Sequence, residues 1–258
     1  MGIACEITYF HPDIEMRNRN GWVEGRSPEK VDIFCQKVKE MSMVDDCHTD
    51  SYSVEISSEV FDTPNKLYNW FKRMDKSMKT KGLYPYHKDF DGGGLHFHID
   101  YPKDVDFLKF YKGMTNFNSN FPYLNWIFNN PVDNENANNI MLKTLKSKKI
   151  PRFSMSSIHK EFSHTLFDYG IEWRIFEMAR NEKEFKLMLD FIVKLHIVVC
   201  TNRTEIYNRK ITEYYNIYAC IRDFCNLLHS LDLNPADYEI FIDRNLYTRF
   251  SYGRRYLI

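Results

Sequence analysis

Four short segments of this 258-residue chain alternate apolar side chains with polar ones, many of them ionisable. Residues two apart share a face of a β-strand, so each segment predicts a strand with one apolar face and one polar face. The segments are 3–9, 53–60, 94–100 and 171–176. Their polar faces carry six groups that could do chemistry together, namely Glu6, Glu55, His96, His98, Glu172 and Arg174.

If these strands belong to one sheet, the six groups converge on one surface. Carboxylates that lie close together repel one another unless cations neutralise them. Carboxylate oxygens with one imidazole suit Mg²⁺ or Mn²⁺, and phosphate oxygens would complete the coordination shell. A fixed arginine beside such a cluster, here Arg174, offers two parallel N–H groups to a phosphate. The set therefore predicts a site where a metal and a phosphate group bind together.

A plainer explanation is that every amphipathic strand has a polar, solvated face, and for any single strand this explanation is the better one. It is weaker for the four strands together, because solvent-facing positions favour Lys, Thr and Ser over paired His and lone Glu. It also gives no reason for the three glycines at 92–94, directly before His96 and His98. The other histidines that we considered are expected in loops or at the surface, namely His11, His48, His87 and His159.

The strands that carry these groups are expected at 3–10, 52–60, 94–101 and 170–178. The rest of the chain must hold them in place. Residues 28–43 predict a helix with Pro28 at its first position. Residues 64–81 are the clearest helix, since Thr63 can cap its start, apolar residues recur at helical spacing, and Gly82 ends it. This order of strands and helices is compatible with both α/β and α+β folds.

Further helices are expected in the second half of the chain. We expect a short helix over 104–113, loops with a short helix over 116–150, and long helices over 181–200 and 204–231, followed by an irregular tail. Arg and Tyr alternate in this tail and could stack on bases. Such a tail more often docks on its own domain or forms a contact between subunits, so we expect no nucleic-acid partner and leave a homo-oligomer open.

Bulk properties are those of a folded protein of one domain. Lys plus Arg and Asp plus Glu number 35 each, so the formal charge is zero and gives no support for wholesale binding to nucleic acid or a membrane. The six cysteines show no Cys-x-x-Cys spacing, which predicts free thiols in a reducing compartment. No signal peptide is expected, and the most apolar stretch, 191–200, is far shorter than the ~20 residues of a membrane span. We therefore expect a soluble, cytoplasmic protein.

The glycines at 92–94 bring these segments close to a known family. Residues 92–98, Gly-Gly-Gly-Leu-His-Phe-His, resemble the Gly-x-x-His-x-His strand of glutamine synthetases and of the amidoligase family, which includes phage-encoded members. Residues 171–176 are similar to its Glu-aromatic-Arg-apolar-Phe strand, and residues 54–58 to its Glu-Ile-Val-Ser segment. Residues 2–6 stand in the place of its N-terminal Gly-x-Glu-x-Glu strand. Order and approximate spacing fit from residue 2 to about residue 200.

The resemblance implies an α+β fold, in which a curved antiparallel sheet (a half-barrel) carries helices on its outer face. Nucleotide, metal ions and substrate would lie on the concave face. It also implies a single carboxylate–amine ligase domain over 1–258, with a mostly helical C-terminal part over 181–258.

Site residues follow from the resemblance position by position. It implies Mg²⁺ (or Mn²⁺) ligands at Glu6, Glu55, His96 and Glu172. His98 would face the nucleotide or its phosphates, and Arg174 would bind the γ-phosphate of ATP and the charge that develops on it. Arg152, in the segment Pro-Arg-Phe-Ser at 151–154, lies where the family often places a further phosphate-binding arginine.

The implied activity is that of an ATP-dependent carbon–nitrogen ligase, or amidoligase. ATP would transfer its γ-phosphoryl group to a substrate carboxylate, and an amine would then attack the resulting acyl phosphate. Glu172, Arg174 and His98 would be the catalytic residues. The substrates would be a small-molecule or peptide carboxylate and an amine, which the sequence does not identify. It does not assign a general base either, although Asp100 is one option.

One departure from the family pattern, and two other functions, stay open. Thr8 stands where the family has the second acid of the N-terminal strand, so one metal position is in question, and Asp50 or Glu59 could substitute. One alternative is a transition-metal hydrolase or oxygenase that uses His96, His98 and a carboxylate, although such a site has no need of a phosphate-binding arginine. The other is a non-catalytic, nucleotide-binding member of the same fold, which the loss of the second acid favours.

Overall fold

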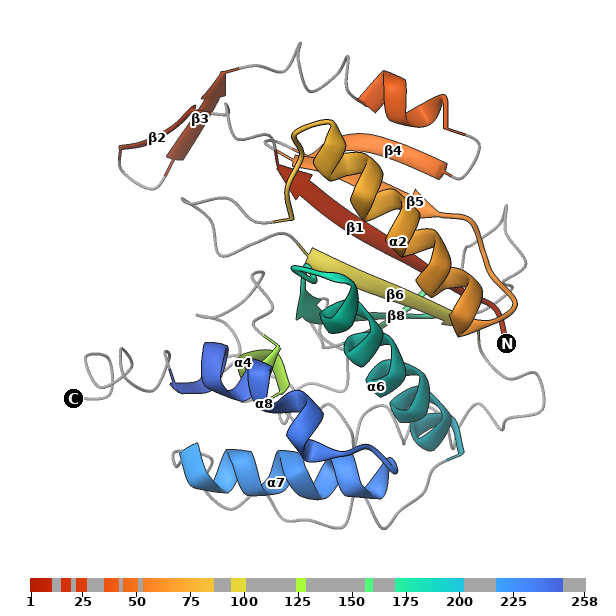
Figure 1. Cartoon of the computed structure of the whole chain (residues 1–258), viewed down its shortest axis with the longest axis vertical. Coiled ribbons are helices and arrows are strands. Elements are labelled where there is room, and N and C mark those ends of the chain that lie inside the picture. Colours follow the sequence, from red (N-terminus) through yellow and green to blue (C-terminus); the bar gives the residue numbers. More distant parts are fainter. Residues whose placement is uncertain are drawn as a thin grey trace.

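The fold is described from a computed structural model of the whole chain (Figure 1). The structure describes residues 1–10, 15–19, 22–26, 35–41, 44–50, 53–85, 94–100, 124–128, 156–159, 170–201 and 217–247. Within these ranges the strands pair antiparallel and the helices pack against them, so the expected α+β class is confirmed.

Six strands form one antiparallel sheet in the order β4-β5-β1-β6-β8-β7. Their bounds are Val44–Asp50 (β4), Ser53–Ser58 (β5), Ile3–Phe10 (β1), Gly94–Asp100 (β6), Gly170–Glu177 (β8) and Ser156–His159 (β7). The four strands expected from alternation are β5, β1, β6 and β8, which are neighbours in this order. They therefore share one sheet, as the convergence of their polar groups requires.

The remaining strands were not expected from the sequence. The edge strands β4 and β7 flank the four central strands, and β2 (Glu15–Arg19) pairs with β3 (Trp22–Arg26) in a separate two-stranded sheet. Strand β4 has the sequence Val-Asp-Asp-Cys-His-Thr-Asp, in which an apolar residue does not recur at every second position. An edge strand of this kind lacks the alternation on which strand prediction depends.

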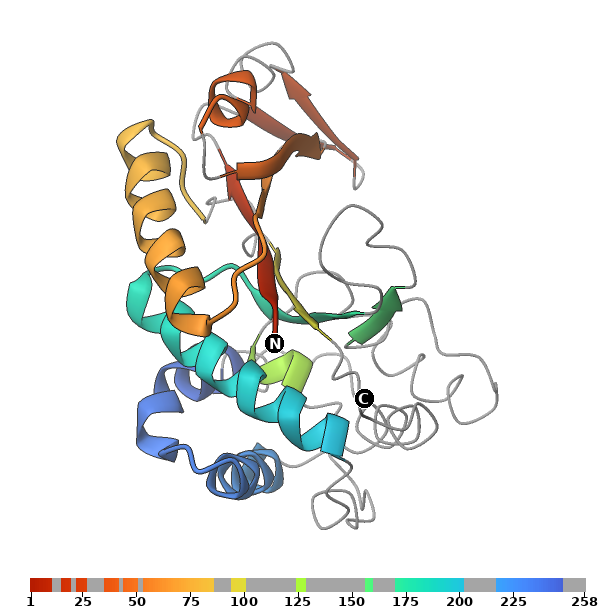
Figure 2. The ribbon, with the colours of Figure 1, turned by 90° about the vertical axis from the view of Figure 1, so that its right-hand side faces the viewer.

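Two long helices, α2 (Pro64–Thr80) and α6 (Glu182–Thr201), lie side by side on one face of the sheet (Figures 1 and 2). The helix expected over 64–81 is confirmed. The Thr63 hydroxyl oxygen accepts the backbone N–H of Lys66 at 3.4 Å, and Gly82 ends the helix with a φ of +80°, a left-handed conformation that glycine adopts easily. Apolar residues at helical spacing face the sheet, namely Leu67, Trp70, Phe71, Met74 and Met78.

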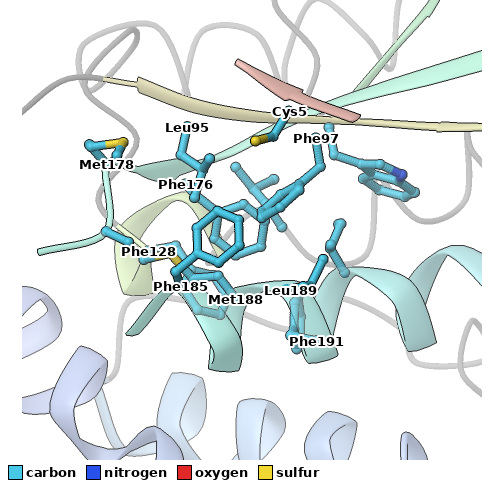
Figure 3. Close-up of a cluster of buried hydrophobic side chains, with 14 of the residues drawn as sticks. Cys5, Leu95, Phe97, Phe128, Phe176, Met178, Phe185, Met188, Leu189 and Phe191 are labelled. Carbon is cyan, nitrogen blue, oxygen red and sulfur yellow. The ribbon is translucent and has the colours of Figure 1, made fainter. Parts of the chain in front are cut away.

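The core fills the space between the sheet and these helices (Figure 3). Phe97 of β6 and Phe176 of β8 meet edge to face, with ring centroids 5.6 Å apart. Phe185 of α6 stacks on Phe71 of α2 with centroids 3.8 Å apart, which joins the two helices. Aromatic pairs of this kind add about 0.5–1.5 kcal/mol each beyond the area that they bury. The core therefore fixes the sheet from the face that carries no ionisable cluster.

Shorter helical segments complete the described structure: α4 (Leu124–Ile127), α7 (Ile217–Ser230), a 3₁₀ turn at Pro235–Tyr238, α8 (Glu239–Phe241) and a π-helical turn at Ile242–Tyr247. The irregular tail expected after residue 231 is therefore wrong for 235–247. Buried Tyr238 and Phe241 hold these turns on the core, and the buried Asn245 side chain donates to the Ile127 carbonyl at 2.8 Å. Because these contacts are tertiary, local sequence did not reveal them.

The other expected helices are described in part. Helix α6 confirms the expectation for 181–200. The helix expected over 28–43 is described at 35–39, and the one over 204–231 is described from Ile217 onward, as α7. The helix expected over 104–113 lies outside the described residues, and the single-domain organisation stays a prediction. No helix in the described ranges is long and apolar enough to cross a membrane.

Candidate functional site

Strand register brings four of the predicted site residues together at the centre of the sheet. Glu6 of β1 lies directly opposite His96 of β6, and His98 of β6 lies directly opposite Glu172 of β8. Directly opposed residues of antiparallel strands point to the same face of the sheet. Because the alternate residues of the same strands form the apolar core under α2 and α6, the four groups lie on the other face.

The four side chains, with Arg174, form a compact network. Nδ1 of His96 lies 3.1 Å from Oε2 of Glu6 and 3.4 Å from Oε1 of Glu172. Nε2 of His98 lies 3.3 Å from Oε1 of Glu6, and Nη2 of Arg174 lies 2.5 Å from Oε1 of Glu172. Each carboxylate therefore contacts two nitrogen-bearing groups. The network is a polar cluster and not a solvated strand face.

Burial differs across this network. Glu172 is 1% exposed, His98 6% and His96 8%, so they form its floor. The side chain of Glu6 is 23% exposed and that of Arg174 is 39% exposed. Among the described groups, the Glu6 carboxylate and the Arg174 guanidinium are thus the ones that reach solvent.

The protonation of Glu6 follows from its neighbours. Burial by itself raises the pKa of the Glu6 carboxyl, but the hydrogen bonds from His96 and His98, together with the charges of these rings, outweigh that effect. The pKa of Glu6 therefore lies well below its usual range. Glu6 is an anion at any physiological pH and is available as a hard oxygen ligand.

Three of these residues have the arrangement of a cation site. Glu6, His98 and Glu172 each offer one ligand atom, and the three atoms lie within 4.8 Å of one another. Two carboxylate oxygens with one imidazole nitrogen fit Mg²⁺ or Mn²⁺. The donor set present in the chain therefore fits the divalent cation that the resemblance implies.

A β-bulge in β8 lies opposite His96. On β6, Leu95 is directly opposite Phe176 and Phe97 is directly opposite Trp173. His96, which lies between them on β6, is therefore opposite two residues of β8. The two residues in the bulge are Arg174 and Ile175. Bulges break the strict alternation of a strand and often re-aim a side chain beside a functional site.

The bulge changes the face on which Phe176 lies. Regular alternation over 171–176 predicts Phe176 on the same face as Glu172 and Arg174. Instead, Phe176 points into the core and packs its ring on that of Phe128, with centroids 4.7 Å apart (Figure 3). The extra residue reverses the alternation after Arg174, which a pattern with a period of two cannot anticipate.

Glu55 lies on the same face, one strand farther out. It lies on β5 directly opposite Thr8 of β1. The residue of β5 directly opposite Glu6 is Ser57, two positions after Glu55. Diagonal neighbours of this kind are about 7–8 Å apart. Glu55 therefore borders the compact cluster of Glu6, His98 and Glu172, and it does not belong to it.

The departure at Thr8 has a defined structural use. Oγ1 of Thr8 donates to the carbonyl of Gly94 at 3.0 Å and thereby ties β1 to the start of β6. Of the two acids that could have replaced a carboxylate at this position, Glu59 is exposed beyond the end of β5. Asp50 of β4 pairs with Ser53, four residues along β5 from the position opposite Glu6. The structure thus places neither acid beside Glu6.

Three further positions are considered beside the site. Arg152, the further phosphate-binding candidate, lies outside the described residues. Ser157 of β7 is directly opposite Glu172, and His48 of β4 is opposite Glu55, although neither was selected from the sequence. We expected His48 and His159 in loops or at the surface; both belong to edge strands and not to loops, and their place at the surface stays a prediction. A pattern search could not find these positions because their strands lack alternation.

A buried histidine supports the site from the core side. Trp173, which lies between Glu172 and Arg174 in sequence, donates its indole N–H to Nδ1 of His196 at 3.2 Å. Nε2 of His196 lies 3.0 Å from the carbonyl oxygen of Asp100, so this nitrogen carries the proton. Burial lowers the pKa of His196 to about 4. The neutral ring therefore links β8 to the end of β6, a role that the sequence did not signal.

Comparisons with known proteins bear on the fold. No protein-family model and no curated protein matches this sequence. The chain is similar in structure to glutamine synthetase from Plasmodium falciparum, with a TM-score of 0.53 and 11% identity over 98% of this chain and 73% of that one. It is also similar to the structure of the prokaryotic ubiquitin-like protein Pup with its ligase PafA, with a TM-score of 0.50 and 10% identity over 98% of this chain and 64% of that one.

A third structure, a bifunctional glutathione synthetase from Pasteurella multocida, matches with a TM-score of 0.44 and 11% identity over 97% of this chain and 47% of that one, and we draw nothing from it. At identities of 10–11%, the first two matches establish the architecture and not the activity. They agree with the resemblance that the strand motifs indicated. The chain has a glutamine-synthetase-like fold.

Proposed function

We propose that this protein is an ATP- and Mg²⁺-dependent ligase that joins a carboxylate to an amine. The observation that carries the proposal is the cluster of Glu6, His98 and Glu172, with the Arg174 guanidinium against it, at the centre of a glutamine-synthetase-like sheet. An acidic site for a hard cation and an arginine that binds phosphate are the two parts that phosphoryl transfer from ATP requires.

The chain's own groups have distinct tasks in this proposal. Glu6 and Glu172 hold the cation, together with one imidazole, and Glu55 is placed to bind a further cation or a water ligand. A bound Mg²⁺ would neutralise charge on the ATP phosphates. Glu172 holds one side of the Arg174 guanidinium at 2.5 Å, which orients its planar fork at the edge of the cluster. That fork is suited to the γ-phosphate and to the charge that develops during its transfer.

The proposed reaction has two steps. A carboxylate oxygen of the first substrate attacks the γ-phosphorus of ATP, the bond to the bridging oxygen breaks, and ADP leaves with that electron pair. The nitrogen of the second substrate then attacks the acyl phosphate, phosphate leaves, and the nitrogen loses a proton. Asp100, at the end of β6 and on the face of His98, is the nearest carboxylate along that strand to take this proton.

The transition-metal alternative fits the network less well. It needs both His96 and His98 on one metal, whereas Nδ1 of His96 is directed at two carboxylates. A non-catalytic member of the fold would keep the cation and nucleotide sites but form no product. Cytoplasmic location, oligomeric state and the identities of the acid and amine stay predictions or open questions.

The first test is calorimetric titration of ATP into the full chain with Mg²⁺ and with EDTA. We expect binding only with Mg²⁺, and we expect Glu172→Gln to lose it. Glu182→Gln is the matched control, because Glu182 is an exposed residue of α6 whose ion pair with Lys72 lies away from the cluster. Binding that survives in Glu172→Gln, or that never occurs, would refute the proposed site.

Turnover is tested separately with hydroxylamine as the amine and a panel of carboxylic acids and acidic peptides. Hydroxylamine traps an acyl phosphate as a hydroxamate, which is detected together with ADP. Hydroxamate formation with one acid class supports the ligase and names the substrate class. Mg²⁺-dependent ATP binding without ADP formation across the panel favours the non-catalytic alternative.

A further inference from the structure

We propose that the outer side of helix α2 is a docking surface for an acidic peptide segment of a partner protein, with a cavity there for one apolar side chain of that segment. Helix α2 packs on the apolar face of the sheet and lies at the outside of the molecule (Figure 2). The ionisable cluster lies on the opposite face of the sheet. The inference therefore goes beyond the proposed ligase function and does not rest on it.

The first observation is the charge of α2. A helix turns by about 100° per residue, so the five cations of α2 fall within an arc of about 140° on the side away from the core. These cations form a basic stripe, which consists of Lys66, Lys72, Arg73, Lys76 and Lys79. No carboxylate of α2 lies in this arc. Asp75, the one acid of the helix, is buried and accepts hydrogen bonds from Tyr9 and Lys79.

The neighbouring helix α6 does not share this distribution of charge. Its side chains that reach solvent carry both signs, with Glu182 beside Lys183 and with Lys186 paired to Asp190 one turn later. The whole chain is neutral, with 35 cationic and 35 acidic residues. Like charges one turn apart repel and destabilise a helix. A stripe of one sign in α2 therefore carries a cost in stability, which a bound anionic partner would offset.

The second observation is a cavity of about 520 Å³ at the same side of α2. Three cations of the basic stripe line it together with one aromatic and one amide side chain, namely Phe61, Lys66, Asn69, Lys72 and Arg73. Long basic side chains lay their aliphatic stems along apolar surface and keep their charged ends in water. The cavity thus combines an apolar wall with a cationic rim. An apolar side chain flanked by carboxylates fits this combination.

The third observation is that most cations of the basic stripe are held loosely. Nζ of Lys66 lies 2.8 Å from the Asp62 carboxylate and Nζ of Lys72 lies 3.4 Å from that of Glu182, but all four side chains are well exposed. Exposed ion pairs of this kind contribute little, so an incoming carboxylate can replace them. Within the described part of the chain, Arg73 forms no ion pair. These cations are therefore available to a partner.

The dimensions of the basic stripe favour a narrow ligand. From Lys66 to Lys79 it runs about 20 Å at 1.5 Å per residue, which matches about six residues of an extended peptide. It is one helix wide, and the exposed carboxylates of Asp62 and Glu182 border it. A membrane surface or a nucleic-acid duplex would also meet these carboxylates and the mixed charges of α6. An extended acidic peptide avoids them.

Binding is tested by fluorescence anisotropy with a labelled synthetic peptide of about eight residues, in which one central phenylalanine is flanked by glutamates. We expect affinity for the full chain to fall about 10-fold or more as ionic strength rises from about 0.01 M to about 0.1 M, because the Debye length shortens from about 30 Å to about 10 Å. Alanine in place of the phenylalanine should weaken binding about 10-fold. Equal affinity for the two peptides contradicts the role of the cavity, and no binding at low salt overturns the proposal.

Arg73→Glu and Arg222→Glu form a matched pair, because each reverses one arginine on an exposed helix face and changes the net charge equally. Arg73→Glu should weaken binding about 10-fold, mainly through a slower association rate, whereas Arg222→Glu on α7 should bind like the wild type. Equal losses would reduce the effect to net charge and overturn the surface. Asn69→Trp fills the cavity and should abolish the preference for phenylalanine. Circular dichroism checks folding, and Lys76→Glu replaces Arg73→Glu if the latter does not fold.

Three comparisons exclude other sites and other partners. Glu172→Gln should bind the peptide like the wild type, and a loss would place the peptide in the ionisable cluster instead. Oligothymidylate of equal charge and phosphatidylserine vesicles should bind more weakly than the peptide. Tighter binding of either one, lost in Arg73→Glu, replaces the peptide with a nucleic acid or a membrane and overturns the proposal. Peptide binding without Mg²⁺-dependent ATP binding supports the docking surface and rejects the ligase, and the reverse result does the opposite.

Discussion

At the scale of single residues, the site depends on side chains whose neighbours settle their charge. Glu6 stays ionised because His96 and His98 donate to it, and His196 stays neutral because it is buried. The Arg174 guanidinium is held by the more deeply buried Glu172. Two predictions follow from these groups, one for function and one for stability.

The planar fork of Arg174 is expected to be essential for binding the γ-phosphate. Arg174→Lys keeps the positive charge but cannot form two parallel hydrogen bonds while it also contacts Glu172. We expect affinity for Mg·ATP to fall about 10-fold or more, since a charge-assisted hydrogen bond contributes about 1.5–3 kcal/mol. Affinity for ADP, which lacks that phosphate, should change less. Equal losses for ATP and ADP in calorimetry would place Arg174 elsewhere on the nucleotide.

Stability should fall as His196 is forced to take up a proton. Burial lowers its pKa from 6.5 to about 4, so the unfolded chain binds this proton more tightly than the folded chain does. The stability contributed by the neutral ring is complete above pH 6.5 and is lost as the pH falls from 6.5 toward 4. At about 1.4 kcal/mol per pH unit, the whole window is worth about 3 kcal/mol.

The check is urea unfolding from neutral pH down to about pH 4 for the wild type and for His196→Gln, which does not titrate. The free energy of unfolding should fall more steeply with acid in the wild type than in the variant. The neighbouring Cys200 thiol does not contribute, because burial raises its pKa to about 12. The same pH slope in both proteins would contradict the prediction.

At the scale of elements, register and helix ends decide what the residues can do. Antiparallel pairing of β1, β6 and β8 puts Glu6, His96, His98 and Glu172 on adjacent rungs, and a one-residue slip would turn them into the core. Helix α6 pins this register, because it packs under β6 and β8 (Figure 3). A local change at the start of α6 should therefore lower the free energy of unfolding.

Asn181 caps α6, since its side-chain oxygen accepts the backbone N–H of Glu184 at 3.0 Å. Asn181→Ala removes this acceptor, and we expect the free energy of unfolding to fall by about 1 kcal/mol. Asn181→Ser preserves an uncharged acceptor at the helix N-terminus and should cost less, whereas Asp would repel the buried Glu184 carboxylate that the Asn181 amide contacts. Urea unfolding measures both variants. A larger loss in Asn181→Ser than in Asn181→Ala would show that the capping hydrogen bond is not the cause.

At the scale of the whole molecule, the C-terminal helical turns are packed against the sheet and helix α6. Arg244 lies 2.7 Å from Glu177 at the end of β8 and 2.9 Å from Glu184 in α6, and the two carboxylates are almost fully buried. This contact joins the end of the described chain to the strand that carries Glu172 and Arg174. The helical part after residue 181 should therefore be needed for a stable sheet.

Arg244→Met tests this link, because it leaves the carboxylates of Glu177 and Glu184 buried without their cation. We expect a loss of about 3–5 kcal/mol in the free energy of unfolding. The triple variant with Glu177→Gln and Glu184→Gln removes the stranded charges and should recover much of that loss. Both are measured by urea unfolding at neutral pH, and a change below about 1 kcal/mol in Arg244→Met would mean that the cluster is solvated.

The sequence by itself determined the central strands, their ionisable face and the long helices, because alternation with a period of two and helical spacing are local properties. It also carried a resemblance to the amidoligase family, through Gly94, His96, His98 and the Glu172-x-Arg174 pair, and the glutamine-synthetase-like fold agrees with that resemblance. The sequence did not predict strands β4 and β7 or the C-terminal turns, because tertiary contacts, and not local patterns, form them.

Only the tertiary structure decided how the site is divided among its residues. The bulge opposite His96 returns Phe176 to the core, Glu55 lies opposite Thr8 and not opposite Glu6, and Thr8 donates to the Gly94 carbonyl at the start of β6. The physical reason is that the sequence of a single strand is enough to show which of its side chains share a face. Which atoms then meet depends on the register between strands and on hydrogen bonds between residues that are up to 90 positions apart, as for Glu6 and His96.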